Sequence, residues 1–248
     1  MHLETLAHGH SLPHRLDPRA KLAAAIGLTL ATALGRGLPV ELAALGMGIA
    51  GVLWARLPWR ELVKRLAPVN GFAAMMWLML PWRLGGAGPL GLGLDPLGLT
   101  LATDITVKAN AIVLMLLALI ATSPMNHIFH ALAHWRVPDK LVHLFIFFYR
   151  YLHVLHREYH RLSLAMKARA FAPRTDLHTY RSYAWLLGML LVRSYDRAQR
   201  VYQAMLCRGF TGTYWLLEHF HWGRRDNLFL AGAGLAFLAL AALGLMGS

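Results

Sequence analysis

The chain has 248 residues, of which 57% are hydrophobic and only 15% are charged. Soluble globular domains are about 45–50% apolar and about 25% charged, so this composition excludes an ordinary soluble domain. The mean hydropathy of +0.44 indicates a membrane protein in which much of the apolar excess faces lipid.

Five stretches approach the roughly 20 apolar residues that a membrane-spanning helix needs. In chain order they are residues 22–38, 38–57, 67–82, 99–122 and 228–246. The fourth contains Asp104 and Lys108, which are one helical turn apart and could neutralise each other inside a bundle. We therefore expect an all-α, polytopic membrane protein with about five transmembrane helices; a sixth span is the alternative.

The basic residues are distributed unevenly between these stretches. If the N-terminus is cytoplasmic, 22 of the 25 Lys and Arg residues lie on the inner side, only Arg36 and Arg83 lie on the outer side, and Lys108 lies within a span. The positive-inside rule then predicts an inner-membrane protein with a cytoplasmic N-terminus. The same bias accounts for the net charge of +13, so we expect a lipid bilayer and no nucleic acid among its partners.

A long basic insertion separates the fourth and fifth stretches. Residues 123–226 carry fifteen basic and six acidic side chains. We therefore divide the chain into a four-span region (1–122), a cytoplasmic coupling-helix region (123–226) and a C-terminal transmembrane helix (227–248).

Proline and glycine residues mark the helices of this insertion. The pairs Ser123-Pro124 and Pro138-Asp139 are typical of helix starts. The helix from residue 139 should run to about residue 171, because Pro173 disfavours helical geometry before it. Another helix should begin near residues 175–176 and end at residue 207 or 208, where Gly209 can adopt the left-handed conformation of a C-terminal cap. Each of these two long helices has roughly 33 residues, about 50 Å.

The ends of the two long helices carry the same pattern. Residues 165–171 (AMKARAF) and 204–210 (AMLCRGF) agree at four of seven positions, and 39 residues separate Arg169 from Arg208. An arginine at the end of a stiff helix suits a cluster of carboxylates or carbonyls on a partner protein. The alternative is that both arginines simply face water.

This repeat, with the opening segment HRLDPRAKL at residues 14–22, resembles the transmembrane T component of energy-coupling factor (ECF) transporters, in particular the CbiQ-like cobalt and nickel branch. The resemblance covers essentially the whole chain. In that family, two Ala-Arg-Gly signatures end long cytoplasmic helices. The matching positions here are Ala168, Arg169 and Ala170, and Cys207, Arg208 and Gly209. Ala170 thus replaces a glycine and Cys207 replaces an alanine.

The resemblance implies a subunit that is not an enzyme and holds no cofactor of its own. Two partner ATPase subunits, which bind ATP, would dock onto Arg169 and Arg208, and a CbiM-like membrane subunit would capture the substrate. Consistent with this, the chain has no G-x-x-x-x-G-K-[ST] phosphate loop. Cobalt is the expected substrate; nickel or a vitamin is the alternative.

The histidines support one rival of another class. His130 with His134, and His156 with His160, are four residues apart, a spacing that can place metal ligands on one helical face. Such pairs are found in integral-membrane di-iron enzymes. That class also needs dense clusters with adjacent histidines, and the sequence has no His-His dipeptide. We therefore favour the coupling subunit.

Overall fold

The computed structural model describes residues 16–35, 37–80, 82–84, 92–94, 96–135, 137–212 and 223–246. Within these ranges it contains eight helices and one pair of short strands, which confirms the expected helical class. The chain divides into two compact units. The bundle unit comprises residues 2–131 and 220–248, and the helix-pair unit comprises residues 132–219.

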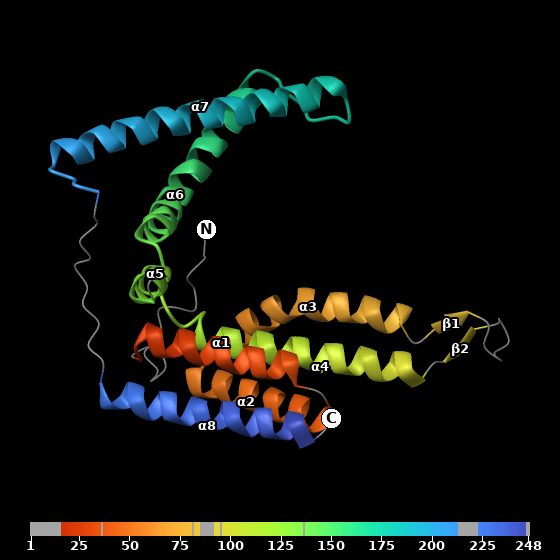
Figure 1. The fold of residues 1–248 in the computed structure, drawn as a ribbon. Helices are drawn as coiled ribbons and strands as arrows, with labels where there is room; N and C mark the ends of the chain where they lie inside the picture. The colour runs from red at the N-terminus through yellow and green to blue at the C-terminus, as the bar shows by residue number, and fades with distance from the viewer. Residues whose placement is uncertain are drawn as a thin grey trace. The chain divides into compact units, whose positions relative to one another are not determined.

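The bundle unit is built around α4. Its helices are α1 (Pro18–Leu34), α2 (Leu38–Ala55), α3 (Trp59–Met79), α4 (Pro96–Leu119) and α8 (Arg224–Met246). Helix α4 packs against α1, α2 and α3, while α8 packs against α1 and α2 (Figure 1). The strands β1 (Trp82–Leu84) and β2 (Leu92–Leu94) form an antiparallel pair between α3 and α4, and α5 (Met125–His134) follows α4.

Small residues let α2 and α4 approach each other closely. A Cβ atom added to Gly48 would lie 2.9 Å from the Cβ of Leu114 and 3.2 Å from the carbonyl oxygen of Ala111. Helices in lipid associate through such close backbone contacts, because the lipid is itself apolar and the burial of apolar side chains adds little to the free energy of association. Two side-chain bonds join α3 to α4 in addition. They are Trp77 Nε1 to Thr106 Oγ1 at 3.0 Å and Asn110 Nδ2 to Asn70 Oδ1 at 2.9 Å.

Among the described residues, three helical segments are long and apolar enough to cross a membrane. They are residues 38–55, 97–119 and 224–244. Helix α1 has 17 residues, and α3 begins well before the apolar stretch predicted from residue 67, so that it includes Arg60, Lys64 and Arg65. Hydropathy missed that start because charged residues interrupt an apolar run without interrupting helical geometry. Large apolar side chains on the bundle face outward, including Leu53 (71% exposed) and Leu235 (69%), as expected of a helical membrane protein.

The helix-pair unit consists mainly of α6 (Asp139–Ala168) and α7 (Leu177–Cys207). The two helices have 30 and 31 residues, about 45 Å each, and they cross within the unit (Figure 1). They begin where the sequence predicted, since Pro138 precedes α6 and Asp176 precedes α7. Helix α6 ends at Ala168 rather than at the expected residue 171, because Ala170 turns into the left-handed region at φ 60°.

Candidate functional site

The two candidate tips are the ends of α6 (residues 166–171) and α7 (residues 205–210). In each, the arginine is the residue that follows the last helical residue: Arg169 has φ −93° and ψ 24°, and Arg208 has φ −94° and ψ 10°. The next residue is left-handed in both, with φ 60° at Ala170 and 80° at Gly209. The sequence placed both arginines in the last helical turn; they cap it instead.

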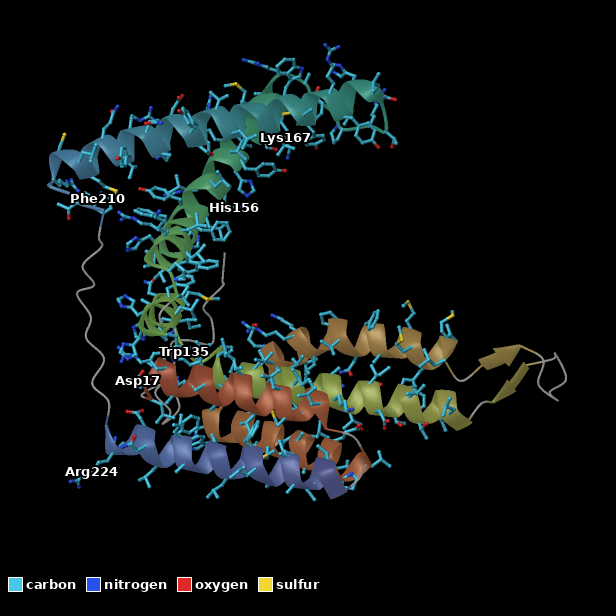
Figure 2. All side chains as sticks on the ribbon, viewed as in Figure 1. Asp17, Trp135, His156, Lys167, Phe210 and Arg224 are labelled. Carbon is cyan, nitrogen blue, oxygen red and sulfur yellow. The ribbon has the colours of Figure 1, made fainter. Side chains whose placement is uncertain are left out.

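The same backbone hydrogen bonds close both tips. In each, the N–H of the phenylalanine donates to the carbonyl of the methionine five residues earlier, and the N–H of the left-handed residue donates to the carbonyl three residues earlier. The bonds are Phe171 to Met166 at 3.2 Å, Ala170 to Lys167 at 3.0 Å, Phe210 to Met205 at 3.1 Å, and Gly209 to Leu206 at 3.0 Å. This pattern is a Schellman cap, so the sequence repeat corresponds to a repeated structure. Figure 2 labels Lys167 and Phe210 near the two tips.

Exposure also repeats between the tips. Arg169 and Arg208 are exposed, whereas the methionine and phenylalanine of each tip are half-buried. Neither guanidinium has a hydrogen bond or ion pair with any residue that the structure describes. Cys207 is an exposed free thiol. The guanidinium donors of both arginines are therefore available to a partner.

The residue after each arginine has a conformational role, which the sequence predicted correctly for Gly209 but not for Ala170. In the structure, the residue after each arginine must adopt a positive φ, which costs a residue with a Cβ atom about 1–2 kcal/mol and glycine nothing comparable. The Ala170 tip therefore carries backbone strain that the Gly209 tip lacks.

Each tip borders a groove between the crossed helices. A groove of about 910 Å³ lies beside Arg169 and Phe171 and is lined by the C-terminal end of α6 and the first half of α7. A second groove, of about 460 Å³, extends to Met205 and Phe210 and is lined by the first half of α6 and the second half of α7. The phenylalanine ring of the first tip packs edge-on against Tyr183 of α7, with 5.7 Å between centroids.

An ion pair that the sequence did not predict joins the two helices where they cross. Arg193 of α7 donates to the carboxylate of Glu158 in α6. Hydrogen bonding to this guanidinium holds the pKa of the Glu158 carboxyl below its ordinary value. Glu158 and Arg193 both line the second groove, and Arg193 also lines the first. The pair therefore links the two helices between the tips.

The histidine spacings yield one close pair. The Nε2 atoms of His156 and His160 lie 3.0 Å apart on the exposed surface of α6. Among the described residues, no three His, Cys, Asp or Glu side chains gather in a way that could hold a metal ion. The histidines before residue 16, together with His219 and His221, lie outside the described residues.

The charged residues of the fourth span pair differently from our expectation. Lys108 contacts Glu41 of α2, with 3.3 Å between Nζ and Oε1, instead of Asp104 on its own helix. Glu41 is completely buried. The Lys108–Glu41 pair joins α4 to α2 and neutralises a carboxylate that has no access to water. If Lys108 paired with Asp104 instead, the buried Glu41 carboxylate would have no compensating charge from it.

Comparison with known proteins relates the chain to metal-ion transport. The family model described as "CbiQ: Cobalt transport protein" matches residues 9–217. The cobalt transport protein CbiQ of Rhodobacter capsulatus is 32% identical over 125 residues, 50% of this chain and 51% of that protein. The nickel permease LarQ of Lactiplantibacillus plantarum is 31% identical over 119 residues, 47% and 42% of the two chains.

An uncharacterised protein of Methanocaldococcus jannaschii is also similar, at 29% identity over 103 residues, 42% of this chain and 38% of that protein. The matched regions thus span about half of these relatives or less. The family model, by contrast, covers most of the chain and includes both tips. The chain therefore belongs to the CbiQ family of cobalt transport proteins, which are transporter components and not enzymes.

Proposed function

We propose that this chain is the coupling T subunit of an ECF-type importer and that its two tips dock onto two ATPase subunits. The main support for this proposal is that both tips have the same cap geometry. Each tip also exposes an arginine that has no hydrogen bond or ion pair with any described residue. Ala168, Arg169 and Ala170 form one docking site, and Cys207, Arg208 and Gly209 form the other. A guanidinium can donate two parallel hydrogen bonds to a carboxylate or to carbonyls in a cleft of each ATPase.

The helix pair suits the transmission of motion. ATP binds to the ATPase subunits, and this chain contributes the levers that follow their movement. An α-helix is stiff along its axis, and the Glu158–Arg193 pair fixes the point at which the two helices cross. Displacement of one tip should therefore move α6 and α7 together and not bend one helix alone.

The transported substrate is proposed to be cobalt, with nickel or a vitamin as the alternatives. Support comes from the family description and from the nickel permease among the relatives. A separate CbiM-like membrane subunit would capture the ion. The contribution proposed for this chain itself is mechanical.

Orientation in the inner membrane follows from the charges of the bundle. The start of α1, the end of α2, the start of α3 and the start of α8 carry most of the basic residues of this unit. They are Arg19, Lys21, Arg56, Arg60, Lys64, Arg65, Arg224 and Arg225. This distribution supports a cytoplasmic position, under the positive-inside rule, for these helix ends and for the inserted residues 123–226, with residues 1–122 and 227–248 as the membrane regions.

Charge reversal at the tips tests the docking role. In Arg169→Glu and Arg208→Glu, we expect weaker co-purification with the ATPase subunits, and in the double variant loss of both co-purification and ATP-driven cobalt uptake. Arg157→Glu in α6 and Arg200→Glu in α7 are matched controls, because these arginines are exposed on the same helices away from the tips. Full assembly and uptake in the double variant would refute the proposal.

A further inference from the structure

The inserted segment has two roots in the bundle unit, and both contain buried polar groups. The outgoing root is Thr122 and Ser123, which follow α4, and the returning root is Gly223 and Asp226, where α8 begins; both roots lie within the bundle unit. Thr122 is completely buried, and Ser123 and Asp226 are 8% and 6% exposed. Figure 2 shows Asp17, at the start of α1, on the same side of the bundle as Arg224.

Lys21 of α1 reaches the outgoing root. Its side chain is 2% exposed, and its Nζ atom donates to the hydroxyl of Ser123 at 2.9 Å and to that of Thr122 at 3.4 Å. The two partners lie about a hundred positions further along the chain. Buried ammonium groups are retained only where oxygen acceptors and an opposite charge compensate for lost hydration. Asp226, on the other root, supplies that charge.

Asp226 binds the start of α1 to the returning root. Its Oδ1 atom accepts from the backbone N–H of Asp17 at 2.8 Å, and its Oδ2 atom accepts from the N–H of Gly223 at 2.9 Å. Asp17 in turn caps α1, because its carboxylate accepts from the N–H of Arg19 at 2.9 Å. The Asp226 carboxylate thus bonds to the start of α1 and to the start of its own helix, α8. It also attracts Lys21, which binds the outgoing root.

We propose that Lys21 and Asp226 form a root clamp, a pair of positioning residues that holds both ends of the inserted segment against α1. The inference rests on the proposed coupling function. Both roots belong to the bundle unit, and the chain continues from them into the helix-pair unit, so force transmitted along the chain from the tips reaches the bundle through them. With the clamp closed, both roots move together with α1. With it open, each root can shift separately and the displacement is absorbed locally.

Lys21→Met is the first test. Hydrogen–deuterium exchange of the purified chain should show about tenfold faster amide exchange at residues 120–128 and 223–228, because one lost buried partner is worth about one decade in the opening equilibrium. In the full transporter, ATPase co-purification and ATP hydrolysis should persist, while cobalt uptake falls by about tenfold or more. Lys64→Met is the matched control, since Lys64 is an exposed lysine (72%) of the same unit, and it should change none of these quantities.

A second variant separates the clamp from a general loss of stability. Lys21→Met/Asp226→Asn removes the unpaired buried carboxylate and should restore the melting temperature, but exchange at the roots should stay fast and uptake low. Recovery of uptake in this variant would overturn the clamp, as would unchanged exchange or full uptake in Lys21→Met. The exchange measurement does not depend on any ATPase. The clamp can therefore fail while the docking role survives, and the Arg169 and Arg208 variants test the docking role separately.

Discussion

Gly209 offers a direct test of the cap geometry at the second tip. Its φ of 80° lies in the left-handed region, and an added Cβ atom would meet no other atom within 4 Å. Gly209→Ala therefore changes backbone strain without a steric clash. The left-handed conformation costs alanine about 1–2 kcal/mol, and the reduced entropy of the unfolded chain returns about 0.4–1 kcal/mol. The expected net loss is about 0.7 kcal/mol.

Amide exchange at Phe210 measures this loss where it occurs. Its N–H donates to the carbonyl of Met205 across the cap at 3.1 Å. A loss of about 0.7 kcal/mol should accelerate its exchange about threefold. In the opposite direction, Ala170→Gly relieves the strain at φ 60° and should slow exchange at Phe171, which makes the equivalent bond in the first tip.

Gly188→Ala is the control for the chemical change itself. Gly188 lies within α7, and a Cβ atom there would also meet nothing within 4 Å. In a helix interior, alanine is favoured over glycine by about 0.5–1 kcal/mol. The same substitution should thus stabilise α7 at Gly188 and destabilise its end at Gly209. If both variants change Phe210 exchange in the same direction, the left-handed cap is not what holds the tip.

The remaining predictions concern the bundle, and thermal unfolding in detergent can check each. Gly48→Ala should cost about 1–3 kcal/mol because the new Cβ would lie 2.9 Å from α4, whereas Gly46→Ala meets no atom within 4 Å and should gain up to about 1 kcal/mol. Lys108→Met should cost about 3 kcal/mol, because it leaves the buried Glu41 carboxylate unpaired, and adding Glu41→Gln should recover part of that loss. Burial lowers the pKa of Lys21, which precedes the apolar run of α1, from 10.5 to about 8. Between pH 8 and 10.5, therefore, the unfolded chain holds this proton and the folded chain does not. The free energy of unfolding, relative to that of Lys21→Met, should rise across this range by up to about 3 kcal/mol. A difference between the two proteins that does not change with pH would contradict this prediction.

The sequence predicted features that depend on neighbouring residues. Proline removes a backbone donor and fixes φ, so Pro124 and Pro138 marked the starts of α5 and α6 within a residue. A Schellman cap involves only six consecutive residues, so the repeated pattern around Arg169 and Arg208 was enough to identify two equivalent tips. The extension of α6 to residue 171 was wrong because alanine gives no signal of a left-handed conformation.

Contacts between distant segments could not be predicted in this way. Helical periodicity suggested that Lys108 pairs with Asp104, since the two lie one turn apart, but it could not indicate that Glu41 of another helix is completely buried beside it. Lys21 was noticed only as a member of the opening motif. Its acceptors Thr122 and Ser123 lie 101 and 102 positions away, and nothing in the local pattern of either segment points to the other.

This division between local and distant contacts bears on how a lever of this kind can fail. The helix pair transmits displacement only if it is held at both ends, at its tips and at its roots in the bundle. If the tips bind the ATPase subunits as we propose, this attachment depends on caps within a few residues of Arg169 and Arg208, so damage there should release the ATPase and leave the bundle intact. The root depends on Lys21 and Asp226, which join segments far apart in the chain, so damage there should leave the ATPase bound and cycling while uptake stops. Loss of uptake with intact assembly is therefore the signature of the root, and loss of assembly is the signature of the tips. Arg157→Glu in α6 and Arg200→Glu in α7, which change exposed arginines away from both tips, should produce neither.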